Sequence, residues 1–598
     1  MPVSDNKKLP PVSSTNGAEV RFQARSVSRG VAIGEVVSLH GNKRQFYKIN
    51  LEDSQIEREI RRFYASIRLA KRQLKKITEK KRENLPELQS SIFETHILML
   101  EDAAFLKKIE SVIKEKKVNA EWAVKSVTQT YTAQYKTIAD EYLRERYIDL
   151  EDVAERILSA LGGGKSSISL KKDSIIVAKE VKPSTLVELV ESSPKAIVSE
   201  HGGWTSHTFI LAREMNLPAV TGSTGILRRV RTGDRIIVDG FNGQVILRPS
   251  AETMRDYRLA AAQFQQTNEQ IIEFADGDVK TLDGREIIIR SNLDLPDGYE
   301  QAKKLGARGI GLYRSEFLFN QYKGFPTEHE QTKAYREIAE MVGEDGVKIR
   351  TFDLSAEHFA DKAAEKEKNP ALGMRAIRLS LTNKKQFRTQ LSAVLQASAN
   401  GRKIDLILPM ISDVSEIMQT KKILEAEKTS LRRKKTAYGN PLIGAMIEVP
   451  SAVFTIDEIA AEVDFLCLGT NDLVQYLLAV DRDNENIAEW FQTLHPSVIR
   501  AIKKVLDAAE NRGIPAIVCG EMAGSPFYAP ILIGLGARQL SMNVNSIARV
   551  RKVISGIAFE ETLELVRMIE NCKSAAEIET LVRKNIREKW AHLFPFEQ

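Results

Sequence analysis

The chain has 598 residues, of which 43% are hydrophobic and 28% are charged, as in ordinary soluble proteins with several domains. It contains no run of eighteen apolar residues, so no membrane span is expected, and a net charge of +7 is too modest at this length to indicate nucleic-acid binding. Three cysteines cannot form a disulfide framework, so a reducing compartment such as the cytoplasm is expected.

The first quarter of the chain changes character twice. Residues 1–20 have the composition of a disordered tail, and residues 21–49 contain short β-like runs. From Ile56 onward, apolar residues recur at spacings of three and four, a helical pattern that continues until three consecutive glycines end it. The pattern predicts an all-helical bundle over residues 50–164.

Strand-like runs resume after this bundle. Residues 165–249 are expected to form a compact α/β domain together with residues 21–49, which makes the helical bundle an insertion into that domain. Apolar residues at helical spacing then predict a linking helix over residues 250–275.

The remaining residues, 276–598, alternate between strand and helix. Eight strand candidates occur in 286–294, 309–314, 347–353, 404–410, 442–450, 465–472, 516–523 and 539–544. Eight β–α repeats of this length predict a (β/α)8 TIM barrel, with an open doubly wound sheet as the alternative. The fold class is therefore a multidomain α/β protein: a compact α/β domain with an inserted all-α bundle, then a TIM barrel.

Polar residues follow several of these strands, where a barrel carries its active site. Four arginines are expected in or near the mouth, and they would repel one another unless an anion lies between them: Arg314, Arg350, Arg375 and Arg482. Glu448 and Asp472 supply two carboxylates, which suits Mg²⁺ when substrate and water complete its coordination. Cys519 ends a strand and is either an inert buried thiol or one activated by the arginines.

The segment HGGWTSHTFILARE, residues 201–214, places a histidine at the start of an amphipathic helix. A phosphoryl group on His207 would face the free amides and the positive end of the helix dipole. A neutral imidazole is also a competent nucleophile. An ordinary residue in a capping region is the alternative for His207, and His201 is a second candidate for the nucleophile.

Several long motifs occur in one order along nearly the whole chain: SRGVAIGEV, FETHILMLEDAAF, GGWTSHTFILAREMNLPAVTG, GIGLYRSEFLF, NPALGMRAIR, IEVPSA, GTNDLVQYLLAVDR and CGEMAG. In these motifs the chain resembles the enzyme I family of the bacterial phosphoenolpyruvate:sugar phosphotransferase system. The resemblance implies that the α/β domain is a phosphohistidine swivel domain, that His207 is its phosphorylated nucleophile and that Cys519 protonates the enolate. It also implies binding of phosphoenolpyruvate by Arg314, Arg350, Arg375, Asn471, Asp472 and Arg482, and of Mg²⁺ by Glu448 and Asp472.

The same resemblance implies partners. The helical insertion would dock a small histidine-containing phosphocarrier protein (HPr), the barrel would form a homodimer, and the protein would act in the cytoplasm without membrane or nucleic acid. The chain departs from the family at residues 355–358, where Ser-Ala-Glu-His replaces Gly-Gly-Asp-Lys. Two alternatives remain: a dikinase or synthase that shares the phosphohistidine domain and barrel, and a degenerate homologue that binds carriers without turnover.

Overall fold

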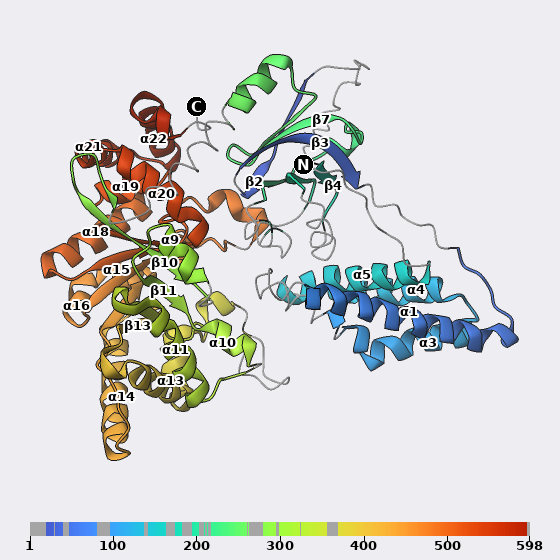
Figure 1. The fold of residues 1–598 in the computed structure, drawn as a ribbon, viewed down its shortest axis with the longest axis horizontal. Helices are drawn as coiled ribbons and strands as arrows, with labels where there is room; N and C mark the ends of the chain where they lie inside the picture. The colour runs from blue at the N-terminus through green and yellow to red at the C-terminus, as the bar shows by residue number, and fades with distance from the viewer. Residues whose placement is uncertain are drawn as a thin grey trace, which may run out of the picture. The chain divides into compact units, whose positions relative to one another are not determined.

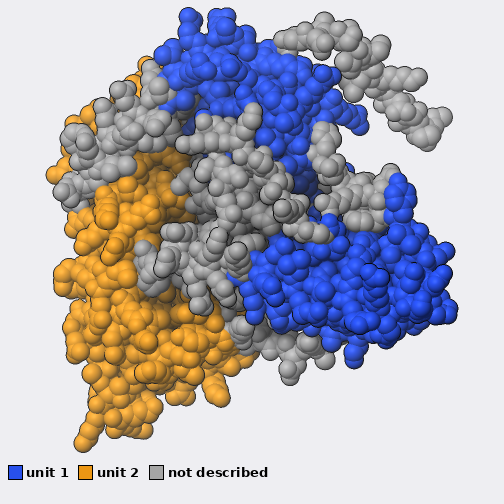
Figure 2. Space-filling model, turned by 45° about the vertical axis from the view of Figure 1, so that its right-hand side comes forward, with its two compact units in different colours: residues 1–261 blue, residues 262–598 orange. Residues whose placement is uncertain are grey.

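The computed structural model divides the chain into two compact units, Met1–Ala261 and Ala262–Gln598 (Figure 2). It describes residues 19–28, 30–39, 47–80, 96–97, 99–136, 141–162, 174–181, 194–201, 209, 212, 217–259, 261, 279–294, 298–322, 324–355, 367, 369–482 and 484–594. His207, most of the predicted helix around it and most of the predicted linking helix lie outside these residues. A helix over 251–259 occupies the described start of that linker.

An eight-stranded sheet lies in the first unit, in the order β1-β8-β7-β3-β4-β5-β6-β2 (Figure 1). Its strands are β1 Val20–Gln23, β2 Arg25–Ser28, β3 Val31–Leu39, β4 Ser174–Ala178, β5 Ala196–Ser199, β6 Ala219–Thr221, β7 Arg235–Asp239 and β8 Gln244–Leu247. Strand β3 pairs in parallel with β4, Val36 opposite Ile175, although the helical segment separates them in sequence. The predicted insertion of helices into an α/β domain is therefore confirmed.

The inserted helices are α1 Asp53–Lys80, α3 Ala103–Lys116, α4 Ala120–Lys136 and α5 Glu141–Leu161. Their apolar faces pack together, with Phe63, Ile109 and Ile157 fully buried. Local signals set the helix ends: the Asp102 side chain accepts hydrogen bonds from the N–H groups of Ala104 and Phe105 and so caps the start of α3.

The second unit contains a closed barrel of eight parallel strands. They are β10 Glu286–Leu293, β11 Ile310–Arg314, β12 Val347–Arg350, β13 Ile404–Leu408, β14 Ile443–Ile447, β15 Phe465–Gly469, β16 Ala516–Cys519 and β17 Gln539–Met542. Each pairs with the next in sequence, and β10 closes the ring by pairing with both β11 and β17. Each of the eight predicted segments holds one strand, so the TIM barrel is confirmed and the open sheet is wrong. A short strand, β9 Val279–Lys280, adds antiparallel to β10.

Helices cover the outside of this barrel (Figure 1). They are α9 Tyr299–Lys304, α10 Glu316–Gln321, α11 Glu328–Val342, α12 Ala376–Thr382, α13 Lys384–Ala397, α14 Val414–Arg433, α15 Pro450–Phe454, α16 Ile456–Ala461, α17 Thr470–Leu478, α18 Pro496–Arg512, α19 Ala529–Gly534, α20 Val544–Gly556, α21 Phe559–Ile569 and α22 Ala575–Lys589. Short 3₁₀ turns occupy η1 Ile226–Arg228, η3 Gly343–Asp345, η5 Pro370–Leu372, η6 Ala399–Gly401, η7 Glu485–Trp490 and η8 Ala591–Leu593. Capping boxes start α11 at Thr327 and α14 at Asp413.

The interior of the barrel is a separate apolar cluster of side chains that point inward from the strands. Its members are Leu312, Ile407, Met446, Phe465, Cys467, Ile517 and Cys519. These apolar side chains fill the barrel, which is therefore not a pore. Polar groups that face inward lie at its two ends. None of the described helices is long and apolar enough to cross a membrane.

Candidate active site

Charged and polar residues collect at the ends of the strands, all on one rim because the strands run parallel. Arg314 and Arg350 are the last residues of β11 and β12, and Cys519 is the last of β16. Glu448 follows β14 directly, and Asn471 and Asp472 lie in the first turn of α17, just after β15. The structure therefore brings together the residues that the sequence placed in one mouth.

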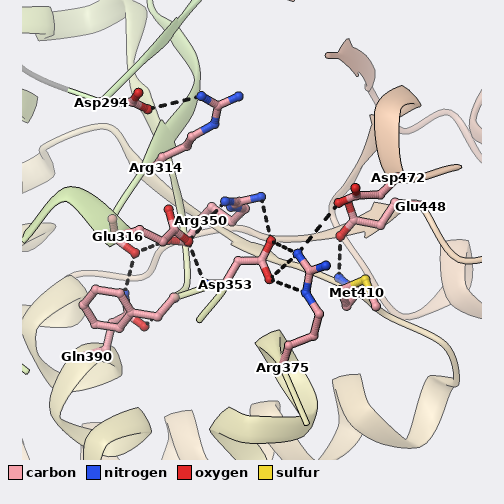
Figure 3. Close-up of polar contacts among 12 residues, drawn as sticks. Asp294, Arg314, Glu316, Arg350, Asp353, Arg375, Gln390, Met410, Glu448 and Asp472 are labelled. Carbon is pink, nitrogen blue, oxygen red and sulfur yellow. Dashed lines mark hydrogen bonds and ion pairs between the residues drawn. The ribbon is translucent and has the colours of Figure 1, made fainter. Parts of the chain in front are cut away.

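Asp353 lies at the centre of this rim, between two arginines (Figure 3). Arg375 donates to Asp353 Oδ1 from Nε at 3.1 Å and from Nη2 at 3.0 Å. Arg350 Nη1 lies 3.2 Å from Asp353 Oδ2. Burial alone would raise the pKa of Asp353, whose side chain is 5% exposed, but the two guanidinium groups outweigh it and hold the pKa below its usual value.

Arg350 has a second carboxylate partner on its other side. Its Nη2 lies 3.1 Å from Glu316 Oε1, and the same oxygen accepts a 2.6 Å hydrogen bond from the backbone N–H of Asp353. Arg350 Nε and Glu316 Oε2 are buried and have no hydrogen-bond partner among the residues that the structure describes. Buried polar atoms without partners are uncommon in proteins, and here they mark spare capacity for a ligand.

Glu448 and Asp472 are the carboxylate pair at this rim (Figure 3). Glu448 Oε1 accepts a 2.7 Å hydrogen bond from the N–H of Met410, a residue held at a φ of 54°. Burial and the negative charges of Asp472 and Asp353 raise the pKa of Glu448 to about 8. Among the described residues, the buried Asp472 Oδ1 accepts no hydrogen bond and has only a 3.5 Å ion pair with Arg482. Two close carboxylates with oxygen atoms to spare fit a divalent cation that takes its other ligands from substrate and water.

Gly469 is required beside this pair. A Cβ at that position would come within 2.5 Å of Glu448 Oε2, so any larger residue would displace the carboxylate. Asn471 and Cys519 are held together nearby: Asn471 Oδ1 accepts from the N–H of Glu521 at 3.1 Å. The hydroxyl of Thr470 donates to the carbonyl of Cys519, also at 3.1 Å.

Arg314 and Arg482 are the outer members of the cluster. Their side chains are 44% and 42% exposed, and their ion pairs are loose, each 3.5 Å long, with Asp294 and Asp472 respectively. The ion pair between Arg314 and Asp294 is exposed on both sides and contributes little to stability, so Arg314 loses little when it turns toward a ligand. The rim thus combines two fixed inner arginines with two outer ones that are less restrained.

Sequence reasoning missed Glu316 and Asp353. Each follows a strand-end arginine by two or three residues, in YRSE and RTFD, and an acidic residue so close to an arginine reads as a local surface pair. Nothing in the linear pattern shows that Arg375, from the start of α12, reaches the same carboxylate. Ser355, the first of the four residues that depart from the family, forms an isolated antiparallel β-bridge with Arg375. The other three residues lie outside the described part of the chain.

Comparison with family models assigns three consecutive regions. Residues 23–146 match the model for the N-terminal domain of PEP-utilising enzymes, residues 170–243 the model for their mobile domain, and residues 268–559 the model for their PEP-binding domain. The rim described above lies within the last of these matches.

Curated relatives cover almost the whole chain. A phosphoenolpyruvate-protein phosphotransferase from Bacillus sp. (strain S) is 36% identical over 563 residues, 94% of this chain and 97% of its own. A protein of the same description from Haemophilus influenzae is 35% identical, over 94% of this chain and 98% of its own. An NMR solution structure of Enzyme I (nEIt) is 30% identical, covers 41% of this chain and 99% of its own, and has a TM-score of 0.36.

Proposed function

Because this chain belongs to the family of the phosphoenolpyruvate-protein phosphotransferases, we propose that it moves the phosphoryl group of phosphoenolpyruvate to its own His207. From His207 the group passes to a histidine of the small phosphocarrier HPr, and pyruvate is released. The observation that carries the proposal is the rim of the barrel, where arginines and a carboxylate pair follow the ends of parallel strands, with Arg482 and Arg375 3.5 Å and 3.9 Å from Asp472.

The arginines bind the substrate in this proposal. Phosphoenolpyruvate carries a phosphate and a carboxylate, and planar guanidinium groups match the oxygens of both. Arg350 has an unused buried Nε–H, and the exposed Arg314 and Arg482 can turn toward an anion. Asn471, one position before Asp472, adds a neutral side chain to the same site.

Glu448 and Asp472 would hold Mg²⁺, which when bound neutralises charge on the phosphoryl oxygens and on the developing enolate. The support lies in the chain's own groups: within the described part of the chain Asp472 Oδ1 has only a 3.5 Å ion pair with Arg482, and burial and neighbouring negative charges disfavour Glu448 as an anion. The contacts with Met410 and Gly469 fix the Glu448 carboxylate in place.

The transfer itself uses the neutral imidazole of His207, which lies in the region matched by the mobile-domain model. Its nitrogen lone pair forms the bond to phosphorus while the bond between phosphorus and the enol oxygen breaks, and that electron pair passes into the enolate of pyruvate. The enolate carbon must then gain a proton. Cys519, at the end of β16, donates it as a thiol and is reprotonated from solvent.

The helical insertion, predicted over 50–164, would dock HPr, and the barrel would pair with a second copy in the cytoplasm. Family membership supports both proposals. Carrier binding by isolated residues 1–261, measured by titration calorimetry, tests the first of them. Sedimentation of the full chain with and without Mg²⁺ and phosphoenolpyruvate tests the second.

One labelling experiment tests the proposed function. The full chain is incubated with ³²P-labelled phosphoenolpyruvate, Mg²⁺ and HPr, and both acid-labile label and pyruvate are followed. Label should appear on the chain and then on HPr, and His207→Ala should abolish both. Label retained by that variant would assign the nucleophile to His201. If folded wild type binds HPr but releases no pyruvate, the chain is instead the carrier-binding homologue without turnover.

A further inference from the structure

The carboxylates of the barrel mouth fall into two groups according to how closely arginines hold them. Asp472, the partner of Glu448 in the proposed cation site, has only longer ion pairs, 3.5 Å with Arg482 and 3.9 Å with Arg375. Asp353 and Glu316 instead contact arginines, at 3.0–3.2 Å and 3.1 Å. The proposed chemistry uses only the first group, so the second has no role yet although both of its members are largely buried.

A single oxygen atom joins the two inner arginines. Asp353 Oδ2 lies 3.2 Å from Nη1 of Arg350 and accepts a 3.0 Å hydrogen bond from Nη2 of Arg375 (Figure 3). Two guanidinium groups this close would repel each other in a low-dielectric site, and the bridging oxygen removes that repulsion. The distance between the two cations therefore depends on Asp353.

The donors of the two arginines are used differently. Arg375 commits Nε and Nη2 to Asp353, and its Nη1 donates to the hydroxyl of Tyr476 at 3.2 Å. Tyr476 is itself fixed by a 2.6 Å hydrogen bond to the carbonyl of Ala371. Arg350 is held at both terminal nitrogens but keeps its buried Nε–H unpaired. Arg375 thus anchors the bridge, and Arg350 retains capacity for a ligand.

We propose that Asp353 is a positioning residue: its bridging carboxylate sets the spacing and orientation of Arg350 and Arg375 for the oxyanions of phosphoenolpyruvate, and Glu316 fixes Arg350 from the opposite side. The inference rests on the proposed function, in which these arginines bind that substrate. Its physical basis is preorganisation: donors already in place lose no free energy to rearrangement when charge develops on the substrate.

A simple role in charge balance makes a different prediction. If Asp353 only neutralised positive charge, its removal would leave the mouth more positive and would strengthen the binding of an anionic substrate. A positioning role predicts weaker binding after the same change. The two roles also differ for Asp353→Glu, which keeps the charge but lengthens the side chain by one methylene and so alters the spacing.

The experiment compares full-length wild type with Asp353→Glu and Asp353→Asn, using steady-state pyruvate release with Mg²⁺ and HPr. We expect both variants to raise the KM for phosphoenolpyruvate about tenfold and to lower kcat/KM by about 10²-fold, the scale of a 1 Å misplacement of a binding group. Wild-type KM in Asp353→Glu, or a KM below wild type in Asp353→Asn, would overturn the positioning role.

The control for folding is a partly buried ion pair between the neighbouring strands β12 and β13. Asp405, in β13, lies 2.5 Å from Lys348, two residues before Arg350 on β12. Asp405→Asn should lower the melting temperature without changing KM. If Asp353→Asn does not fold, Glu316→Gln serves instead: this residue contacts Arg350 and not Arg375, and a several-fold rise in KM is expected, whereas an unchanged KM contradicts the proposal. If wild type itself releases no pyruvate with Mg²⁺ and HPr, that result would refute the proposed function and not the positioning role of Asp353.

Discussion

The two ends of the barrel carry similar charged residues, but these residues differ in how completely their side chains are hydrogen-bonded. The closed end is the end of the barrel at which the strands begin. There Lys348 pairs with Asp405 and lies over the ring of Phe465. Arg290 donates hydrogen bonds to Gln539 and to two backbone carbonyls. At the mouth, two residues further along β12, Arg350 has an unpaired Nε. None of the described residues Arg290, Lys348 and Asp405 has a buried side-chain nitrogen or oxygen without a hydrogen-bond partner.

The difference separates structural polar groups from functional ones. A polar group that only stabilises a fold is paired as fully as the packing permits, because an unpaired buried atom costs free energy. A binding group must keep an unpaired atom for its ligand. One unpaired atom alone does not identify a site, because Arg285, directly before β10 at the other end, also has a buried unpaired Nε, which lies against the ring of Phe559. The mouth differs because two unpaired atoms, Arg350 Nε and Glu316 Oε2, belong to residues that contact each other.

The largest expected effect separates two thiols in the barrel interior. Cys519 ends β16 at the mouth, whereas Cys467 lies deeper, opposite Ile517 on the neighbouring strand. Cys519→Ala should lower the rate of pyruvate release by about 10²–10⁴-fold, the usual contribution of a general acid. Cys467→Ala should have a much smaller effect, because burial and a hydrogen bond with Cys519 raise the pKa of that thiol, which is not the group that donates the proton.

The readout that isolates this step is the exchange of pyruvate methyl hydrogens with solvent deuterium in the presence of Mg²⁺, followed by NMR. Exchange should fall with turnover in Cys519→Ala, while the affinity for phosphoenolpyruvate is retained. Exchange at the wild-type rate would identify another group as the acid and leave Cys519 as packing in the apolar interior cluster.

The next effect compares the two cations of β12. Arg350→Lys should lower kcat/KM by about 10²–10³-fold, because an ammonium group cannot make the forked contacts to carboxylates and ligand together. Lys348→Met should leave KM unchanged but destabilise the fold by about 2 kcal/mol, because the partly buried Asp405 loses its charged partner and keeps only the N–H of Leu442. Steady-state kinetics and thermal unfolding of both variants test these two predictions. If Arg350→Lys lost stability but kept its kcat/KM, the proposed role of Arg350 in binding would be contradicted.

Much of this architecture could be predicted from the sequence because its signals are local. Each barrel strand is a short apolar run, and in β14 all five residues are buried, as expected for a parallel strand covered on both faces. Parallel strands place their carboxyl ends on one rim, so Arg314, Glu448 and Cys519 could be grouped without any coordinates.

What the sequence could not provide was the pairing within the rim. Asp353 contacts Arg375 across 22 residues, and whether a carboxylate serves an arginine or a cation depends on which side chain it faces in space. Periodicity carries no such information. The unpaired Nε of Arg350 is likewise a property of the packed structure, because it depends on which acceptors the neighbouring strands and loops leave within reach.

A smaller effect compares two glycines that face the barrel interior. A Cβ at Gly469 would meet Glu448 Oε2, whereas a Cβ at Gly444 would meet the ring of Phe465 near the closed end. Gly469→Ala should weaken Mg²⁺ binding by about 10–100-fold, as when the support of a metal ligand is removed. Gly444→Ala should lower stability and leave Mg²⁺ affinity intact. Calorimetric titration with Mg²⁺ tests both, and equal affinities in the two variants would count against Glu448 as a ligand.

The smallest effect is a pH dependence that only the mouth should show. Burial and neighbouring carboxylates raise the pKa of Glu448 to about 8, whereas a glutamate in an unfolded chain titrates near 4.3. The folded protein without metal therefore keeps Glu448 protonated at neutral pH. Since ionisation is disfavoured in the folded state, this group lowers stability as pH rises from about 4 to 8 and adds no further change above 8.

Binding of Mg²⁺ to the ionised carboxylate must release the Glu448 proton below about pH 8, so Mg²⁺ affinity should fall about tenfold per pH unit from pH 8 toward pH 6. Calorimetry in two buffers of different ionisation enthalpy should record about one proton released per Mg²⁺ near pH 6.5 and almost none near pH 9. Asp405→Asn at the closed end should reproduce that pattern, because Asp405 faces Lys348 and not the carboxylate pair. Proton release that is absent at pH 6.5 in wild type would mean that Mg²⁺ binds without Glu448, and the distinction between the two ends of the barrel would then rest on the arginines alone.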